Sequence, residues 1–108
     1  MSTGIIAGNV KSITVMQATV DLGSVAANTS EEETATLTGV KTGDIVQVIK
    51  SDLDAGIILG SVRVTGDDSI SIQVVNTTAS PVDAASETMD FLVVRPESVT
   101  NYPTKVLS

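Results

Sequence analysis

The sequence contains neither cysteine nor histidine. Without cysteine, no disulfide framework, thiol nucleophile or thiolate metal ligand is possible. Without histidine, the chain lacks the commonest general base, the base of a catalytic triad and the commonest zinc ligand. A Ser–Lys pair is still chemically feasible, but the lysines are scattered and form no motif with the serines. We therefore predict that the protein is not an enzyme, binds no metal or cofactor, and acts on no small-molecule substrate.

Aromatic residues are almost absent, since the chain has one Phe (Phe91), one Tyr (Tyr102) and no Trp. Carbohydrate-binding modules stack sugars on Trp or Tyr, so that class lacks its usual platform here. The 108 residues suit one domain with one modest core. Aromatic side chains bury more area than Val, so this core is thin, and association between subunits would supplement its stability.

Positive charge is also scarce, with six Lys and Arg against thirteen Asp and Glu and a formal net charge of −7. Nucleic-acid binding and docking on anionic lipid both depend on cationic side chains, so we expect neither partner. No apolar run approaches the roughly 20 residues that a membrane helix needs. The segment Met1–Gly8 lacks the basic start and the apolar stretch of a secretory signal. These features predict a soluble protein.

The residues that are abundant favour β-strands. Val and Ile dominate the apolar set and Thr is common, and all three branch at Cβ. Ile13 and Val15 alternate in one phase and Ala18, Val20 and Leu22 in the other, which predicts a bulge or break between two short strands. Alternating or continuous apolar patterns predict strands at 10–15, 18–22, 34–38, 45–50, 57–59, 61–65, 70–75 and 87–95.

Turn residues separate these strands. Gly66–Ser69 is the strongest hairpin signal, loops are expected at 23–30 and 76–86, and Pro96 ends the last strand. The spacing predicts an all-β fold, a β-sandwich or jelly-roll-like barrel of about eight short antiparallel strands. We expect an N-terminal arm (1–9), a β-sandwich domain (10–96) and a C-terminal tail (97–108).

The strand at 45–50 is apolar on both faces, with Val46 and Val48 on one and Ile45 and Ile49 on the other. Such a strand lies either at the centre of the sandwich or at an oligomer interface. The sequence leaves both alternatives open.

Three acidic clusters are candidate sites. Asp52-x-Asp54-x-Gly56 resembles the start of a calcium loop, but the twelfth position is Arg63 instead of a bidentate Glu, so an ordinary turn is expected. Asp67-Asp68 lies at a hairpin tip, where Asp favours turns. The run Glu31, Glu32 and Glu33 either docks on a basic patch of a partner or forms a solvated edge that discourages sheet association.

Both termini carry apolar residues outside the predicted strands. On a partner surface each would contribute about 1–2 kcal/mol from buried area, whereas the alternative is that the termini are disordered or fold back on their own domain. Together with the acidic run, they form the candidate partner-binding set: Ile5, Ile6, Glu31, Glu32, Glu33, Tyr102, Val106 and Leu107.

The segment from Gly39 to Val94 combines several of these elements in a fixed order. A Gly43-Asp44 turn precedes the apolar strand 45–49, a Gly56-Ile57 step follows, and the hairpin from Arg63 to Asn76 leads to a closing strand at 91–94. This pattern, over about half of the chain, resembles small proteins encoded among the virion genes of tailed bacteriophages.

The resemblance implies a capsid decoration or cement protein. Such proteins are often β-sandwiches that form trimers and bridge neighbouring subunits of the major capsid protein on the outer surface of the virion, after a soluble phase in the host cytoplasm. The alternative within the same resemblance is a tail-fibre or receptor-binding β-module. In that case the tip at Gly66–Ser69 and the loop at 76–86 would contact a host surface.

Overall fold

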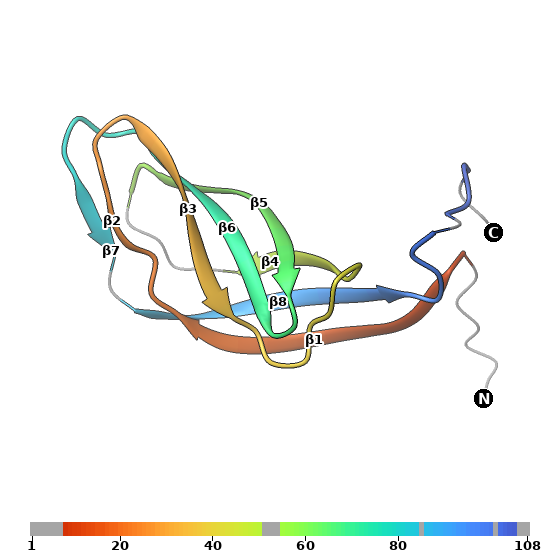
Figure 1. Ribbon diagram of the computed structural model, residues 1–108. Helices are drawn as coiled ribbons and strands as arrows, with labels where there is room; N and C mark the ends of the chain where they lie inside the picture. Colours follow the sequence, from red (N-terminus) through yellow and green to blue (C-terminus); the bar gives the residue numbers. More distant parts are fainter. Residues whose placement is uncertain (1–7, 51–54, 85, 101, 106–108) are drawn as a thin grey trace.

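The computed structural model describes residues 8–50, 55–84, 86–100 and 102–105 (Figure 1). These residues form eight strands and no helix, so the all-β prediction is confirmed. The strands are β1 (Val10–Val20), β2 (Gly23–Val25), β3 (Thr29–Thr36), β4 (Ile45–Lys50), β5 (Ile57–Gly66), β6 (Ser69–Asn76), β7 (Val82–Ala84) and β8 (Glu87–Pro96).

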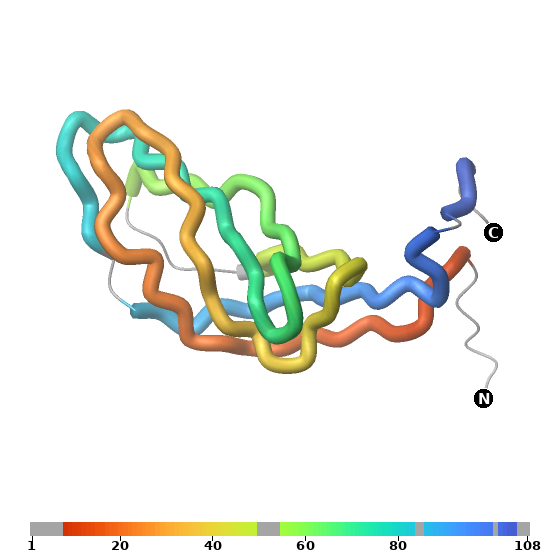
Figure 2. The backbone as a smooth tube through the Cα atoms, viewed as in Figure 1, coloured from red at the N-terminus to blue at the C-terminus, as the bar shows by residue number. Residues whose placement is uncertain are grey.

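The strands form three antiparallel sheets. Two sheets have three strands each, in the orders β1–β8–β4 and β3–β6–β5, and β2 pairs with β7 in a short ribbon. Figures 1 and 2 show the two larger sheets as two layers, with the ribbon at one end. Among the described residues no sheet closes on itself, so the barrel alternative is wrong.

The core lies between the layers and depends on the central strand of each sheet. β6 contributes Ile70, Ile72 and Val74, and β8 contributes Met89 and Phe91, all almost fully buried. Residues two apart on a strand share a face, so each central strand directs one complete face inward. Val93 is buried on β8 as well, and the other buried hydrophobic residues come from the remaining strands and loops: Val20, Leu22, Val25, Leu37, Val40, Val46 and Ile57.

β1 is one continuous strand where the sequence predicts two. It pairs with β8 from Ser12 to Val20, and its only register shift lies between Val10 and Ser12. Ile13 and Val15 are 50% and 68% exposed, whereas Val20 is 3% exposed. The first half of β1 runs with β8 past the end of the β3–β6–β5 sheet, as Figure 2 shows. The reversed apolar phase therefore marks a change in which face is covered and not a break.

Two expected loops contain strands. Residues 23–30 include β2, and residues 76–86 include β7, which pairs with it. The buried side chain of Asn76 holds the two segments together, because its Nδ2 donates to the carbonyl oxygens of Val25 at 3.0 Å and Ser80 at 2.9 Å. This pairing is invisible to local periodicity, because each strand has only three residues.

The hairpin at Gly66–Ser69 is confirmed, and Asp68 has a structural role in it. Asp68 adopts a positive φ of 62°, a conformation that Asp tolerates in turns. Its Oδ1 accepts a hydrogen bond from the Gly39 backbone N–H at 2.7 Å, and its backbone carbonyl accepts one from the Leu37 N–H at 3.0 Å. The carboxylate at this tip thus fastens the β5–β6 hairpin to the loop after β3.

An ion pair fastens the turn before β4 to β8. Arg95 donates from Nε to Asp44 Oδ1 at 3.0 Å and from Nη2 to Asp44 Oδ2 at 2.8 Å. The Lys41 backbone N–H also donates to Oδ2, at 3.0 Å. The Asp44 side chain is only 3% exposed. Its hydrogen bonds with Arg95 hold the pKa of Asp44 below the ordinary value, although burial acts in the opposite direction.

We expect Asp44→Asn to lower the free energy of unfolding by about 2 kcal/mol at pH 7, because a hydrogen-bonded charge is lost. A carboxyl whose pKa is lowered by folding stabilises the protein fully above its unfolded-state pKa, and this contribution is lost as the pH falls through the folded-state pKa. Urea unfolding of both proteins should therefore converge in acid. The exposed Asp67, changed to Asn, is the control and should have little effect. A difference that is independent of pH would contradict the assignment.

Candidate interaction surface

The outer face of the β1–β8–β4 sheet is apolar. Two rows cross it in register, Ile13–Val94–Ile45 and Val15–Leu92–Gln47. Because neighbouring residues on a strand point to opposite faces, these side chains face away from the core that Phe91 and Val93 enter. We call the following residues the apolar face: Ile13, Val15, Ile45, Leu92 and Val94.

The apolar face is substantially open to solvent. Ile45 is 53% exposed, and Ile13 and Val15 have comparable or higher exposure, while Leu92 and Val94 on the central strand are half-buried between them. Single exposed hydrophobic residues are ordinary on protein surfaces, whereas a contiguous group across three strands makes this face a candidate interaction surface.

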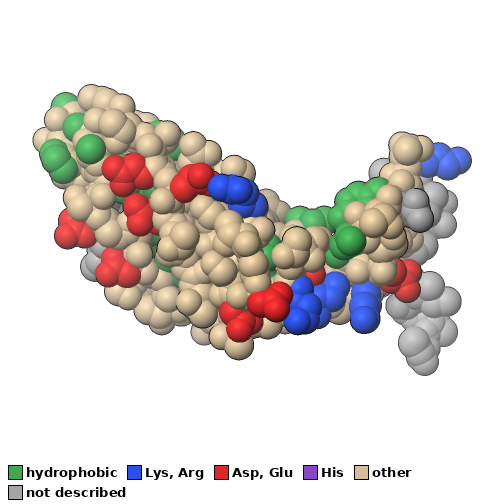
Figure 3. Space-filling view, viewed as in Figure 1, with side chains coloured by type: hydrophobic (Ala, Val, Ile, Leu, Met, Phe, Trp, Pro, Cys, Tyr) green, Lys and Arg blue, Asp and Glu red, His purple; other side chains and the backbone are tan. Residues whose placement is uncertain are grey.

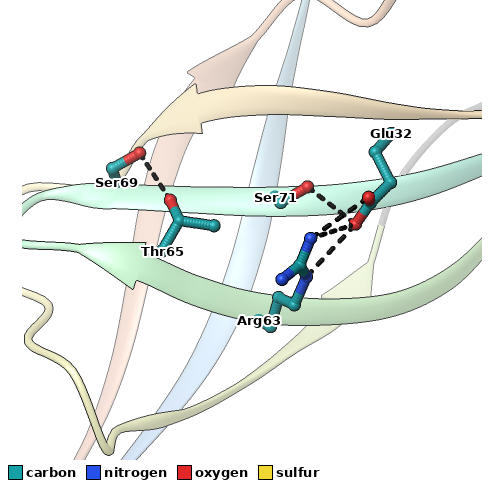
Figure 4. Close-up of polar contacts among 5 residues, drawn as sticks. All are labelled: Glu32, Arg63, Thr65, Ser69 and Ser71. Carbon is teal, nitrogen blue, oxygen red and sulfur yellow. Dashed lines mark hydrogen bonds and ion pairs between the residues drawn. The ribbon is translucent and has the colours of Figure 1, made fainter.

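The outer face of the β3–β6–β5 sheet has the opposite character. Arg63 Nη2 donates to both carboxylate oxygens of Glu32, at 2.8 and 3.1 Å, and Ser71 Oγ donates to Glu32 Oε1 at 3.1 Å. Thr65 and Ser69 share a hydrogen bond of 2.9 Å beside them (Figure 4). These polar groups are mutually satisfied and suit contact with water.

The two outer faces differ in character, and this contrast makes the apolar face the candidate contact surface. In the view of Figure 3, the surface over β3 and β6 is mainly polar side chains and backbone, with acidic groups among them. The apolar face lies on the other layer of the fold. A partner that covers it would remove hydrophobic area from water without breaking any hydrogen bond among the described side chains.

β4 also bears on this assignment. The sequence allowed a double-sided apolar strand either at the centre of the sandwich or at an interface, but β4 ends its sheet beside β8. The central position is therefore wrong. Val46 enters the core while Ile45 and Ile49 remain more than half exposed, and the interface alternative stays a prediction.

The acidic run does not form one charged patch. Glu32 lies on the outer face of β3, and its pKa is lowered by hydrogen bonds from Arg63 and Ser71. Glu31 and Glu33 lie on the other face of the same strand, opposite Val74 and Ile72 of β6. A partner binding at one face would contact only part of the run. The role of the three residues in partner binding stays a prediction.

Glu33 carries a charge at a cost to stability. Its pKa is raised, first by burial and then by the neighbouring carboxylates of Glu31 and Asp21. Ionised Glu33 therefore opposes folding above its folded-state pKa, and this penalty is relieved as the pH falls through that value. Inward-pointing charges of this kind prevent edge strands from pairing with other chains.

The residues next to the two termini are joined to each other. The Asn9 side chain donates from Nδ2 to the Ser98 carbonyl at 2.8 Å and accepts from the Ser98 N–H, also at 2.8 Å. Tyr102 is described and is 52% exposed. The other apolar candidates, Ile5, Ile6, Val106 and Leu107, lie outside the described residues. Whether residues 1–9 and 97–108 act as an arm and a tail stays a prediction.

The described part of the chain contains no group of three or more acidic side chains placed to hold a metal ion. Asp52 and Asp54 of the calcium-like segment lie outside the described ranges. No helix among the described residues could cross a membrane.

The apolar face was missed as a site from sequence, although two signals pointed to it. One was the reversed apolar phase between Val15 and Ala18, and the other was the double-sided strand at 45–50. No protein-family model, curated protein or solved structure matches the chain.

Proposed function

We propose that the protein is a non-enzymatic structural protein of the virion, which decorates the capsid of a tailed bacteriophage by bridging subunits of the major capsid protein. The observation that carries the proposal is the apolar face, because its exposed hydrophobic side chains favour burial against a partner and not catalysis. The resemblance of Gly39–Val94 to phage virion proteins supplies the partner. The location on the outer surface of the capsid stays a prediction of the resemblance. So does the homotrimer, and the mass in solution decides between that trimer and the dimer argued below.

The energetics suit a repeated lattice. Fully burying one Val, Leu or Ile side chain contributes about 1.5–3 kcal/mol, but the residues of the apolar face are already partly covered. Association also costs several kcal/mol of lost rotational and translational freedom. One apolar face therefore binds weakly. Many copies on a shell, linked to each other or to two capsid subunits at once, bind far more tightly through effective concentration.

The tail-fibre or receptor-binding alternative has less support. Its contact regions would be the hairpin tip and the loop at 76–86, and both are engaged within the fold. Asp68 binds Gly39, and the Asn76 side chain accepts hydrogen bonds from the N–H and hydroxyl of Thr78. These hydrogen bonds hold both loops to the body of the fold, and neither loop contains an aromatic residue that could anchor a receptor.

The test is a matched pair of lysine substitutions on the two central strands. Val94 and Val75 are both half-buried on outer faces, Val94 on β8 within the apolar face and Val75 on β6. We expect Val94→Lys to weaken binding to assembled capsids at least 10-fold and Val75→Lys to bind as the wild type does. Cosedimentation with capsids that lack this protein measures the binding, and circular dichroism verifies folding.

Two results would overturn the proposal. Wild-type protein that does not sediment with capsids would exclude the capsid as the partner. Equal losses for the two variants, or none for Val94→Lys, would exclude the apolar face as the contact surface.

A further inference from the structure

The two larger sheets have four outer edges, and three of them carry features that prevent pairing with another chain. β3 directs the charged side chains of Glu31 and Glu33 to the inner side of its sheet. β5 has register irregularities between Leu59 and Val62 and again before Gly66. β4 has six residues and a register irregularity after Val48. Inward charges, bulges and short length are the usual protections of edge strands.

β1 has none of these protections along most of its length. It has 11 residues, and its ladder to β8 is regular from Ser12 to Val20. That stretch contains no charged residue and no proline. Residues 11–15 are all exposed, on both faces of the strand. In the described part of the chain, β8 is the only strand that pairs with β1. A long, regular, uncharged edge is a site for β-strand addition.

We propose that β1 pairs with β1 of a second copy of this chain, antiparallel and about a two-fold axis. The two β1–β8–β4 sheets then become one continuous sheet across the dimer. A two-fold contact uses the same surface on both copies, so it requires a self-complementary strand.

β1 meets this requirement. Full overlap of Val10–Val20 with its copy places Val15 opposite Val15 of the partner subunit. Ile13 then faces Gln17 of the partner subunit, and no two like charges stand opposite each other on the strands. The apolar face also continues across the new edge onto the second copy, because Val15 belongs to it.

Charge at the ends of the paired strands favours the same partner. In this register, Lys11 of the partner subunit lies opposite Thr19, two residues from the exposed Asp21. Thr19 and Asp21 line a groove beside the end of β1, together with Val20, Thr34 and Ser69. This groove offers space for the first residues of the partner strand. The two-fold axis produces the Lys–Asp arrangement at both ends.

The interface is small, which sets the concentration of the test. An 11-residue strand is about 37 Å long. A single strand edge of that length buries less than the roughly 800 Å² per partner of a standard stable complex. We therefore expect a weak dimer, with a dissociation constant on the order of 10 µM. On a capsid, the high effective concentration of neighbouring copies would strengthen the pairing.

The experiment uses opposite charges at Val15. Sedimentation velocity of the full chain from about 5 to 500 µM should show the wild type passing from 11.1 kDa to twice that mass. Val15→Lys and Val15→Glu should each stay monomeric, because like charges would face each other across the axis. An equimolar mixture of the two variants should dimerise again, because opposite charges then face each other.

Two further variants complete the test. Ile58→Lys is the matched control, since Ile58 is 53% exposed on β5 of the other sheet, and it should dimerise as the wild type does. Lys11→Glu places an acid beside Asp21 and should weaken the dimer at least 10-fold, which gives a second measurement if a Val15 variant does not fold. These measurements are made without capsids, so they are independent of the capsid-binding test. The dimer can be absent while capsid binding is present, and capsid binding can be absent while the dimer forms.

A wild type that remains monomeric over this range, or that forms a trimer, would overturn the inference. Dimers of either Val15 variant alone, or a mixture that stays monomeric, would also overturn it.

Discussion

Replacing Phe91 with alanine should destabilise the protein more than any other single truncation, by about 4 kcal/mol. Phe91 is 0% exposed and is the only Phe in the chain. It lies on the central strand β8, in register with Met16 of β1 and Val48 of β4. Truncation removes its contacts with both layers and leaves a cavity that a rigid pair of sheets cannot close.

This loss of about 4 kcal/mol is large, because the total free energy of unfolding of a domain of this size is about 5–15 kcal/mol. A fall in the melting temperature of about 15–25 °C is the corresponding thermal effect. Urea unfolding followed by circular dichroism measures the free energy. Leu92→Ala is the control, because Leu92 is adjacent but belongs to the apolar face, and its truncation should cost clearly less. Equal losses at the two positions would contradict the placement of the core.

Replacing Asn76 with alanine is expected to cost about 3 kcal/mol. Asn76 is 0% exposed, and its Nδ2 and Oδ1 each take part in two hydrogen bonds. Alanine leaves the carbonyls of Val25 and Ser80 and the N–H of Thr78 without this partner. Each buried polar group left unsatisfied costs about 1–3 kcal/mol.

The effect of Asn76→Ala should be concentrated at the β2–β7 ribbon, since Asn76 connects the two sides of it. Hydrogen exchange should therefore show residues 23–25 and 82–84 losing protection before the two larger sheets do. Gln73→Ala is the control on the same strand, because Gln73 is half-buried on the outer face. A loss below 1 kcal/mol for Asn76→Ala would mean that its hydrogen bonds are not needed to hold this end of the fold.

The two proposals use adjoining parts of one sheet. The capsid proposal depends on the face of β1, β8 and β4, and the dimer proposal depends on the free edge of β1. If both proposals hold, pairing at the edge of β1 places two apolar faces in one continuous surface. This doubles the apolar area that capsid subunits could bury. The raised pKa of Glu33 is consistent with this division, because the fold accepts an unfavourable, partly buried charge on β3 and has no comparable charge on β1 from Ser12 to Val20.

Composition and local pattern were sufficient to predict much of the fold. The abundance of β-branched residues predicted an all-β chain, and alternation located β4, the β5–β6 hairpin and β8. Pro96 ends β8 as expected, because proline cannot donate a ladder hydrogen bond. These features succeed because each depends on residues close together in sequence.

Long-range contacts decided the rest. β2 and β7 are too short to produce a periodic pattern, and a side chain 51 residues from Val25, that of Asn76, helps to hold them together. The run of three Glu residues was recognised from sequence, but pairing with β6 determines that Glu32 faces outward and that Glu31 and Glu33 face the other side. For the same reason, the candidate surface could not be identified from the sequence alone. The apolar residues Ile13, Val15 and Ile45 are visible in any reading of the chain, yet only the stacking of one sheet over the other decides which apolar face is covered and which stays open.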